Sequence, residues 1–177
     1  RYGTTPVTVV LRDDGGLPGD DTSDPYVFTI TITAVNDAPT FTIPAEDVVP
    51  EDAGWQEKLW ATGVSAGPWG EDGQALEFTT TNNYNDLFED QPEITLAPDN
   101  TTGTLTYSPT HDMSGTAVVT VTLTDNGGTA NDGQNTYSQT FQIIVDPVND
   151  PPVPVDHTYL ITEDHVLAVD APGVLSG

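Results

Sequence analysis

Apolar and polar side chains alternate along several short segments of this chain. In residues 118–123 and 26–32, large apolar residues recur at every second position, with threonines between them. The same period of two is present in residues 76–80 and 103–107. A period of two in β-branched and aromatic residues is typical of β-strands that bury one face. These four segments are therefore predicted to be strands.

Turn-forming residues separate the predicted strands. Clusters of Gly, Pro, Asp and Asn occupy residues 67–73, 97–100 and 125–128, and the chain holds 16 Gly and 15 Pro in all. No segment sustains the period of an amphipathic helix. Short strands with turns at intervals of about eight to twelve residues predict an all-β protein, an antiparallel β-sandwich of the immunoglobulin type.

The strand pattern belongs to an internal repeat. The matching segments are residues 7–16 with 119–128, 28–32 with 141–145, and 35–39 with 148–152. The offset is 112 residues for the first pair and 113 for the other two. Such an offset is the length of a whole domain and exceeds the unit of a helical solenoid or a propeller blade. The sequence therefore predicts β-sandwiches in tandem, with a function that belongs to the array.

The repeat also predicts the domain boundaries. Val-Asn-Asp, followed within two residues by proline, ends each copy, and proline both stiffens a linker and disfavours helix before it. Glu51-Asp52 returns as Glu163-Asp164 after 112 residues, so the openings of the copies are in phase. The predicted domains are residues 1–37 as the last strands of a preceding copy, residues 38–150 as one complete sandwich, and residues 151–177 as the first strands of a following copy.

Charge narrows the set of partners. The chain carries 28 acidic residues against three basic ones, a formal net charge of -25. A field of this sign repels nucleic acid and anionic membranes and attracts cations. No run reaches the roughly 20 apolar residues of a membrane span, so direct membrane insertion is not expected. A second interpretation of the same composition is adaptation to a saline habitat.

Motifs that would indicate catalysis are missing from the sequence. There is no cysteine, no Gly-x-Ser-x-Gly elbow, no phosphate-binding loop and no zinc-ligand spacing. His111, His157 and His165 are scattered over predicted loops and strand ends, and we do not count them among the candidate ligands. The chain is therefore not expected to be an enzyme.

Several segments together resemble a known family. Residues 102–107, 115–128, 141–145 and 148–152 are similar to the cadherin-like and immunoglobulin-like tandem repeats of very large bacterial surface proteins. The resemblance implies a secreted or cell-surface bacterial protein, an adhesin, stalk or filament. It also implies that the partners are neighbouring repeats of the same or an adjacent chain, with a cell-surface or polysaccharide target.

The resemblance further implies Ca²⁺ at the junctions between repeats. In cadherins the ions lie between an Asn-Asp linker and acidic loops of the domains on both sides. Here Ala34 stands where the first linker would carry a further Asp, and the paired-carboxylate motifs are reduced to single carboxylates, so fewer ions per junction are implied. The positions that match are Asn36, Asp37, Glu71, Asp72 and Asp125 for the first junction, and Glu51, Asp112, Asp146, Asn149 and Asp150 for the second.

Elementary coordination chemistry agrees with this assignment. Calcium needs six to eight oxygen ligands, which acidic loops of adjoining domains can supply. The simpler alternatives are a solvated acidic loop, and for Asn-Asp before proline a self-contained turn. Three functions stay open. The chain is a calcium-rigidified spacer, a carbohydrate- or protein-binding module that uses Trp55, Trp60 or Trp69, or a filament subunit whose incomplete ends pair between molecules.

Overall fold

The structure is a computed structural model that describes residues 2–14, 22–151, 158, 160–166 and 168. It divides into two units, Arg1–Pro147 and Val148–Gly177. Every strand among the described residues lies in the first unit. In chain order the elements are β1 (Gly3–Val9), β2 (Tyr26–Ile32), β3 (Thr40–Thr42), β4 (Glu46–Pro50), β5 (Gln56–Ser65), β6 (Leu76–Asn82), η1 (Asn85–Leu87), β7 (Phe88–Leu96), β8 (Gly103–Pro109), β9 (Gly115–Asp125), η2 (Ala130–Asp132) and β10 (Thr136–Asp146).

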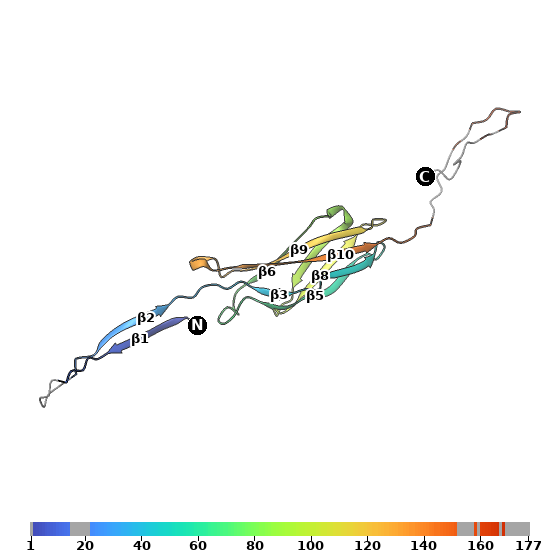
Figure 1. Cartoon of the computed structure of the whole chain (residues 1–177). Coiled ribbons are helices and arrows are strands. Elements are labelled where there is room, and N and C mark those ends of the chain that lie inside the picture. Colours follow the sequence, from blue (N-terminus) through green and yellow to red (C-terminus); the bar gives the residue numbers. More distant parts are fainter. Residues whose placement is uncertain (1, 15–21, 152–157, 159, 167, 169–177) are drawn as a thin grey trace. The chain divides into compact units, whose positions relative to one another are not determined.

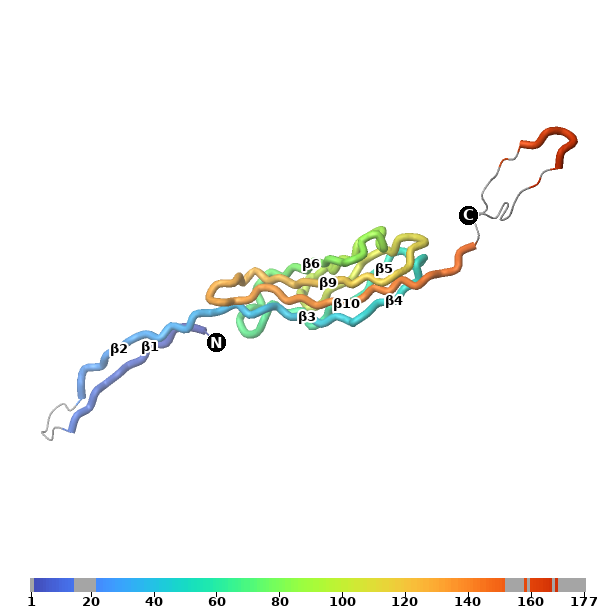
Figure 2. Tube along the Cα trace, turned by 45° about the horizontal axis from the view of Figure 1, so that its top comes forward, coloured from blue at the N-terminus to red at the C-terminus, as the bar shows by residue number. Residues whose placement is uncertain are grey.

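Strands β3 to β10 form two four-stranded sheets that pack face to face (Figures 1 and 2). One sheet has the order β4-β10-β9-β6 and the other the order β3-β5-β8-β7. The first strand is divided between them, because β3 pairs with β5 whereas β4 pairs with β10. The β4–β10 pair is parallel and the other pairs of the two sheets are antiparallel. This is the strand order of an immunoglobulin-type sandwich, which confirms the predicted all-β sandwich, whereas its repetition in tandem stays a prediction.

The alternation of apolar residues locates the predicted strands correctly. Residues 26–32 form β2, and residues 76–80, 103–107 and 118–123 lie inside β6, β8 and β9. The alternation does not predict β7, whose sequence FEDQPEITL contains Pro92. This strand lies at the edge of its sheet, and its register shifts between Asp90 and Glu93. Edge strands and irregular registers are where proline is tolerated in a sheet.

The core lies between the two sheets. In β9 every second side chain is buried, from Ala117 through Val121 to Leu123. From β10 Phe141 joins this layer, with its ring centroid 4.9 Å from that of Trp60 on β5. Each fully buried side chain of this size contributes roughly 1.5–3 kcal/mol relative to exposure. The sandwich therefore owes its stability to burial, since the chain has no cysteine and no disulfide.

A partly buried polar cluster links the two sheets. Asp47 on β4 accepts a hydrogen bond from the Tyr107 hydroxyl of β8 at 2.7 Å. The Lys58 ammonium of β5 donates to both carboxylate oxygens of Asp47, each at 2.7 Å. Burial, and then the hydrogen bond to Asp47, raise the pKa of Tyr107 well above its ordinary value. We call these three residues the inter-sheet clasp.

Strands β1 and β2 form a separate antiparallel hairpin that precedes the sandwich in sequence. Its pairs run from Gly3↔Ile32 to Val9↔Tyr26. Apolar side chains of this hairpin, such as Phe28 and Ile30, are exposed to solvent. The hairpin supplies the two strands predicted within residues 1–37. Its assignment to a preceding copy stays a prediction.

The second unit carries no strand among its described residues, and a turn occupies residues 163–164. The prediction that residues 151–177 begin a following copy falls largely on residues 152–157, 159, 167 and 169–177, which lie outside the described residues. In the part of the chain that is described, none of the helices has the length and apolar character needed to cross a bilayer.

Candidate metal centres

Asn36 fixes the linker before β3 to two loops of the sandwich. Its Nδ2 donates to Asp125 Oδ1 at 2.8 Å and to the Gln134 carbonyl at 2.6 Å. Its Oδ1 accepts from Gln74 Nε2 at 2.7 Å, and its carbonyl accepts from the Gln134 amide at 2.9 Å. Asp125 and Gln134 flank the β9–β10 connection, and Gln74 lies in the β5–β6 loop. One linker side chain therefore ties three separate segments together.

Two carboxylates are buried where the linker meets these loops, which is the place of the predicted first junction. Glu71 is 8% exposed and Asp125 is 4% exposed. Glu71 Oε1 accepts from the Asp37 amide at 3.0 Å, and Asp125 Oδ1 accepts from the Gly127 amide at 2.8 Å. The second oxygen of each carboxylate, Glu71 Oε2 and Asp125 Oδ2, is buried without a hydrogen-bond donor, as is Gln74 Oε1. The junction thus holds three buried acceptor oxygens that the protein leaves unsatisfied.

No cationic side chain compensates these carboxylates among the described residues. Lys58 belongs to the inter-sheet clasp, and the ion pairs found in the described part of the chain include neither Glu71 nor Asp125. A buried carboxylate oxygen without a donor costs free energy, and native structures normally pair such groups. A bound cation satisfies several oxygens at once. The donor set, two carboxylates and an amide oxygen, suits a hard cation such as Ca²⁺.

Glycines leave the space that these side chains occupy. A Cβ on Gly67, in the β5–β6 loop, would overlap Glu71 Oε2. A Cβ on Gly127, in the β9–β10 loop, would overlap Asn36 Oδ1 and come within 2.6 Å of Gln74 Nε2. Asn36, Glu71, Gln74 and Gly127 also line one small hollow. The turn glycines that separate the strands therefore also shape the junction.

The structure brings together part of the residue set predicted for the first junction. Asn36, Glu71 and Asp125 meet there, and Asp37 contributes its backbone amide while its side chain is exposed. Asp72 follows Glu71 with an exposed side chain. The sequence did not predict Gln74, which is the third residue with an unsatisfied buried oxygen. Its only sequence signal is its position three residues after Glu71 in the same loop.

A second acidic group lies at the other end of the sandwich. His111 Nδ1 is 2.8 Å from Asp112 Oδ1, and His111 Nε2 is 3.6 Å from Asp52 Oδ1. Among the described residues, these three form the one group of three or more His, Cys, Asp or Glu side chains whose ligand atoms all lie within 4.8 Å of one another. All three are exposed. Asp112 is in the predicted set, whereas Asp52 and His111 are not.

The other residues predicted for the second junction are divided between the two units. Glu51 is buried, and its amide donates to the Asp146 carbonyl at 3.0 Å, so the start of the β4–β5 turn lies against the end of β10. Asn149 and Asp150 belong to the second unit, where Asn149 Nδ2 donates to the Asp150 carbonyl at 3.3 Å. The gathering of Glu51 and Asp112 with this second linker stays a prediction.

The tryptophans divide into two classes. Trp60 is buried in the core, which removes it from any surface for sugar stacking. Trp55 and Trp69 are exposed, Trp69 to 72%.

The comparisons with known proteins give no relative for this chain, since neither the protein-family models nor the curated proteins contain a match.

Proposed function

We propose that this chain is a structural repeat of a secreted or cell-surface bacterial array, and that Ca²⁺ stiffens the junction in front of its complete sandwich. One observation carries the proposal: Glu71 Oε2, Asp125 Oδ2 and Gln74 Oε1 are buried at the junction without a donor. The sandwich fold and the resemblance to cadherin-like bacterial surface repeats agree with it. A spacer needs stiff connections, and this connection gathers unsatisfied oxygens.

The residues present fit the ion. Glu71, Asp125 and Gln74 would hold it from the sandwich, and Asp37 would reach it from the linker. A bound calcium ion supplies positive charge and takes six to eight oxygen ligands. Water molecules would fill the coordination positions that the protein leaves open. Binding to the sandwich and the linker together would restrain the linker. The hydrogen bonds of Asn36 already bring the linker to the loops that carry Glu71, Gln74 and Asp125.

The test is calcium-dependent stability in matched variants. An extracellular module has a dissociation constant of about 10⁻⁴–10⁻³ M. Calcium at about 10 mM would therefore add roughly 1.4–2.7 kcal/mol to the free energy of unfolding. In Glu71→Gln and Asp125→Asn this increment should disappear. The exposed acids Glu89 and Asp90 on β7 provide controls with the same charge change, Glu89→Gln and Asp90→Asn, which should keep the increment.

The metal-free state provides a second, opposite readout. Without calcium, Glu71 and Asp125 are buried charges with no cationic partner, so Glu71→Gln should melt at or above the wild-type temperature in chelator. In calcium the order should reverse. A residue that merely packs would lower the melting temperature in both conditions. Titration calorimetry gives the stoichiometry directly. Absence of any heat of binding, with melting temperatures that are equal in chelator and calcium, contradicts the proposal.

Salt tolerance is separated from calcium binding by the same experiment. If the negative charge only suits a saline habitat, sodium chloride at equal ionic strength should stabilise the sandwich as much as calcium, by screening. Specific ligation predicts that Glu71→Gln loses the calcium response and keeps the sodium response.

The exposed Trp69 favours a second candidate function, the binding of carbohydrate or protein ligands. Aromatic side chains supply flat apolar faces for such contacts. A polysaccharide array probed with the wild type and with Trp69→Ala tests this function. Binding that is lost in Trp69→Ala and kept in Trp55→Ala would support it, and no binding by the wild type would count against it.

A further inference from the structure

The hairpin β1–β2 repeats the strand pairing of β9–β10. In the hairpin Val7 pairs with Phe28, and in the sandwich Val119 pairs with Phe141. Every other pair of the hairpin, from Gly3↔Ile32 to Val9↔Tyr26, has its counterpart at the same offsets of 112 and 113 residues. The loop between the strands differs by one residue in length, and the register is preserved across it. The hairpin is therefore a second example of the last two strands of this sandwich.

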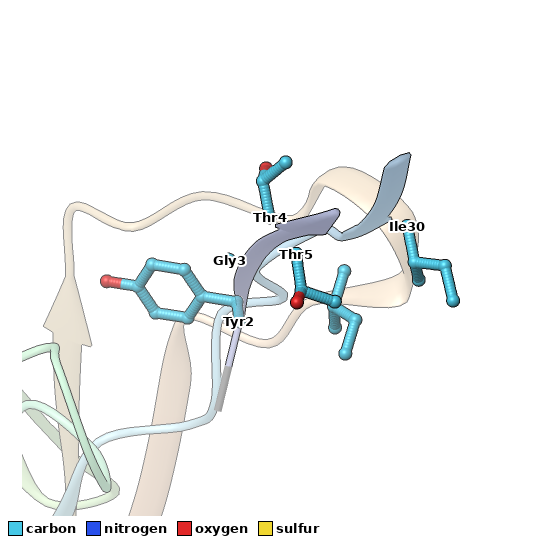
Figure 3. A pocket seen from close by; sticks show the side chains of 6 residues that line it. Tyr2, Gly3, Thr4, Thr5 and Ile30 are labelled. Carbon is cyan, nitrogen blue, oxygen red and sulfur yellow. The ribbon is translucent and has the colours of Figure 1, made fainter. Parts of the chain in front are cut away.

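The counterparts of the core residues are exposed in the hairpin. Phe28 is 41% exposed and Ile30 is 45% exposed, whereas Phe141 and Ile143 in the sandwich are 2% and 0% exposed. Figure 3 shows Thr5 and Ile30 projecting on one side of the hairpin, with Thr4 on the other. The residues on this face, which we call the hairpin face, are the exposed Thr5, Val9, Phe28, Ile30 and Ile32 and the half-buried Val7.

Two equivalent glycines show that the hairpin face lacks the segment that covers the sandwich core at this end. Gly115 at the start of β9 has φ +155°, and a Cβ there would lie 3.1 Å from the ring of Tyr84 and 3.8 Å from Leu87. Gly3 at the start of β1 has nearly the same backbone angle, φ +147°, but nothing lies within 4 Å of its Cβ position. A hollow lined by Gly3, Thr5, Ile30 and Ile32, with Tyr2 and Thr4, occurs at this place (Figure 3). In the sandwich, the segment around η1 covers the equivalent glycine.

We infer that the hairpin face is the docking surface for a second copy of strands β3–β8, located N-terminal to β1 in the same polypeptide. In that copy the counterpart of Trp60 packs on Phe28, as Trp60 packs on Phe141. The counterparts of Tyr84 and Leu87 cover Gly3. The proposal does not depend on calcium, because it concerns only the apolar face and the register.

Connection length favours a copy in the same polypeptide over a separate molecule. In the complete sandwich only residues 110–114 join β8 to β9. A strand β8 placed upstream of β1 therefore reaches its position through an equally short loop, which closes at low entropic cost. A separate molecule would have to give up its own β9 and β10 before it could accept the hairpin. An exposed apolar sheet face is unfavourable in water. A partner in the same polypeptide covers such a face at every protein concentration.

An extended chain tests the inference. Residues 38–114 are placed directly in front of Gly3, so that the new junction reproduces Ser114–Gly115. Hydrogen exchange should then show amides of β1 and β2 protected at least about 100-fold more than in the original chain, because they become part of a cooperative sandwich. Of the three added tryptophans, the copy of Trp60 should emit at shorter wavelength than the exposed copies of Trp55 and Trp69, because it becomes buried on Phe28.

Two substitutions on β2 of the extended chain provide matched controls. Ile30→Asp puts a charge at the counterpart of buried Ile143 and should abolish the new protection. Thr29→Asp puts the same charge at the counterpart of exposed Gln142 and should leave it unchanged. Equal effects of the two substitutions, or an extended chain whose β1 and β2 amides exchange as fast as before, overturn the inference.

Sedimentation of the 177-residue chain over a concentration series tests the occupant. A monomer with rapidly exchanging hairpin amides supports an upstream copy. A dimer in which the hairpin amides become protected overturns the inference of an upstream copy in favour of a second molecule. Ile30→Asp should then dissociate that dimer.

Discussion

The inter-sheet clasp yields a sharp prediction because its three members contribute unequally. Tyr107 is fully buried, and its hydroxyl donates to Asp47 Oδ2 at 2.7 Å. The Lys58 side chain is 32% exposed, and that of Asp47 is 11% exposed. The substitution Tyr107→Phe keeps the ring in the core and removes only the hydroxyl. Asp47 keeps its bond to Lys58, so no carboxylate is left without a partner.

The expected cost follows from these contacts. A hydrogen bond to a charged group contributes about 1.5–3 kcal/mol, and Tyr107→Phe should lower the free energy of unfolding by that amount. At roughly 4 °C per kcal/mol for a domain of this size, the melting temperature should fall by about 6–12 °C. The substitution Lys58→Met keeps the apolar stem and removes a partly exposed ion pair, which is worth less than about 1 kcal/mol.

Alkaline pH provides an independent signature. The pKa of Tyr107 is raised in the folded state by burial and by the bond to Asp47. A raised folded pKa contributes stability that is complete below the unfolded value of about 10 and is lost as the pH rises above it. The unfolded chain then releases a proton that the folded chain keeps, so stability falls by about 1.4 kcal/mol per pH unit. Tyr107→Phe lacks this component, and its stability should approach that of the wild type above about pH 10.

Urea unfolding between about pH 7 and 11, followed by tryptophan fluorescence, measures both effects at constant calcium. Tyr26→Phe, which removes an exposed hydroxyl from the hairpin, serves as the control and should change stability by less than about 0.5 kcal/mol. The reasoning is refuted if Lys58→Met costs more than Tyr107→Phe, or if Tyr107→Phe has the same alkaline slope as the wild type.

Two further substitutions probe the junction and the core. Gly127→Ala adds a Cβ that overlaps the Asn36 side chain. It should lower the free energy of unfolding by about 1–3 kcal/mol and weaken calcium binding in titration calorimetry. The control Gly73→Ala, with open space around its Cβ position, should leave the calcium affinity unchanged. Leu105→Ala in the fully buried core should cost about 2–5 kcal/mol in urea unfolding, whereas exposed Leu59→Ala should cost less than about 0.5 kcal/mol; equal costs would place the core elsewhere.

The sequence predicts the sandwich because its strands are amphipathic in the simplest way. Strands β2 and β9 alternate apolar residues with threonine, and the structure places them where the period of two indicates. The division of the first strand into β3 and β4 is not predictable in this way. The three residues of β3 are too few to show a period of two. The chain then crosses to the second sheet because β4 pairs with β10, which is remote in sequence.

The junction was predictable only in part, and for a physical reason. Asn36 and Asp125 are 89 residues apart in sequence, and no local spacing connects them. Only the resemblance to cadherin-like repeats predicted that both belong to one junction. Gln74 escaped prediction because a neutral side chain carries no charge signal. The pair Asp52 and His111 escaped because proximity across the β4–β5 and β8–β9 connections follows from sheet order alone. The recurrence of Asp52 as Asp164 was the available signal for one of them.

The parallel pairing of β4 with β10 has a mechanical consequence. The chain enters the sandwich ahead of β3 and leaves it after β10, at opposite ends of the two sheets (Figure 2). Tension along the chain therefore pulls β4 and β10 past each other in opposite directions. The five pairs from Gln142↔Glu46 to Asp146↔Pro50 carry this load side by side, in shear. They must rupture together, whereas strands that are peeled apart lose their hydrogen bonds one at a time. Forced extension is governed by the rate of that rupture, so this sandwich should resist pulling along its axis without a covalent crosslink.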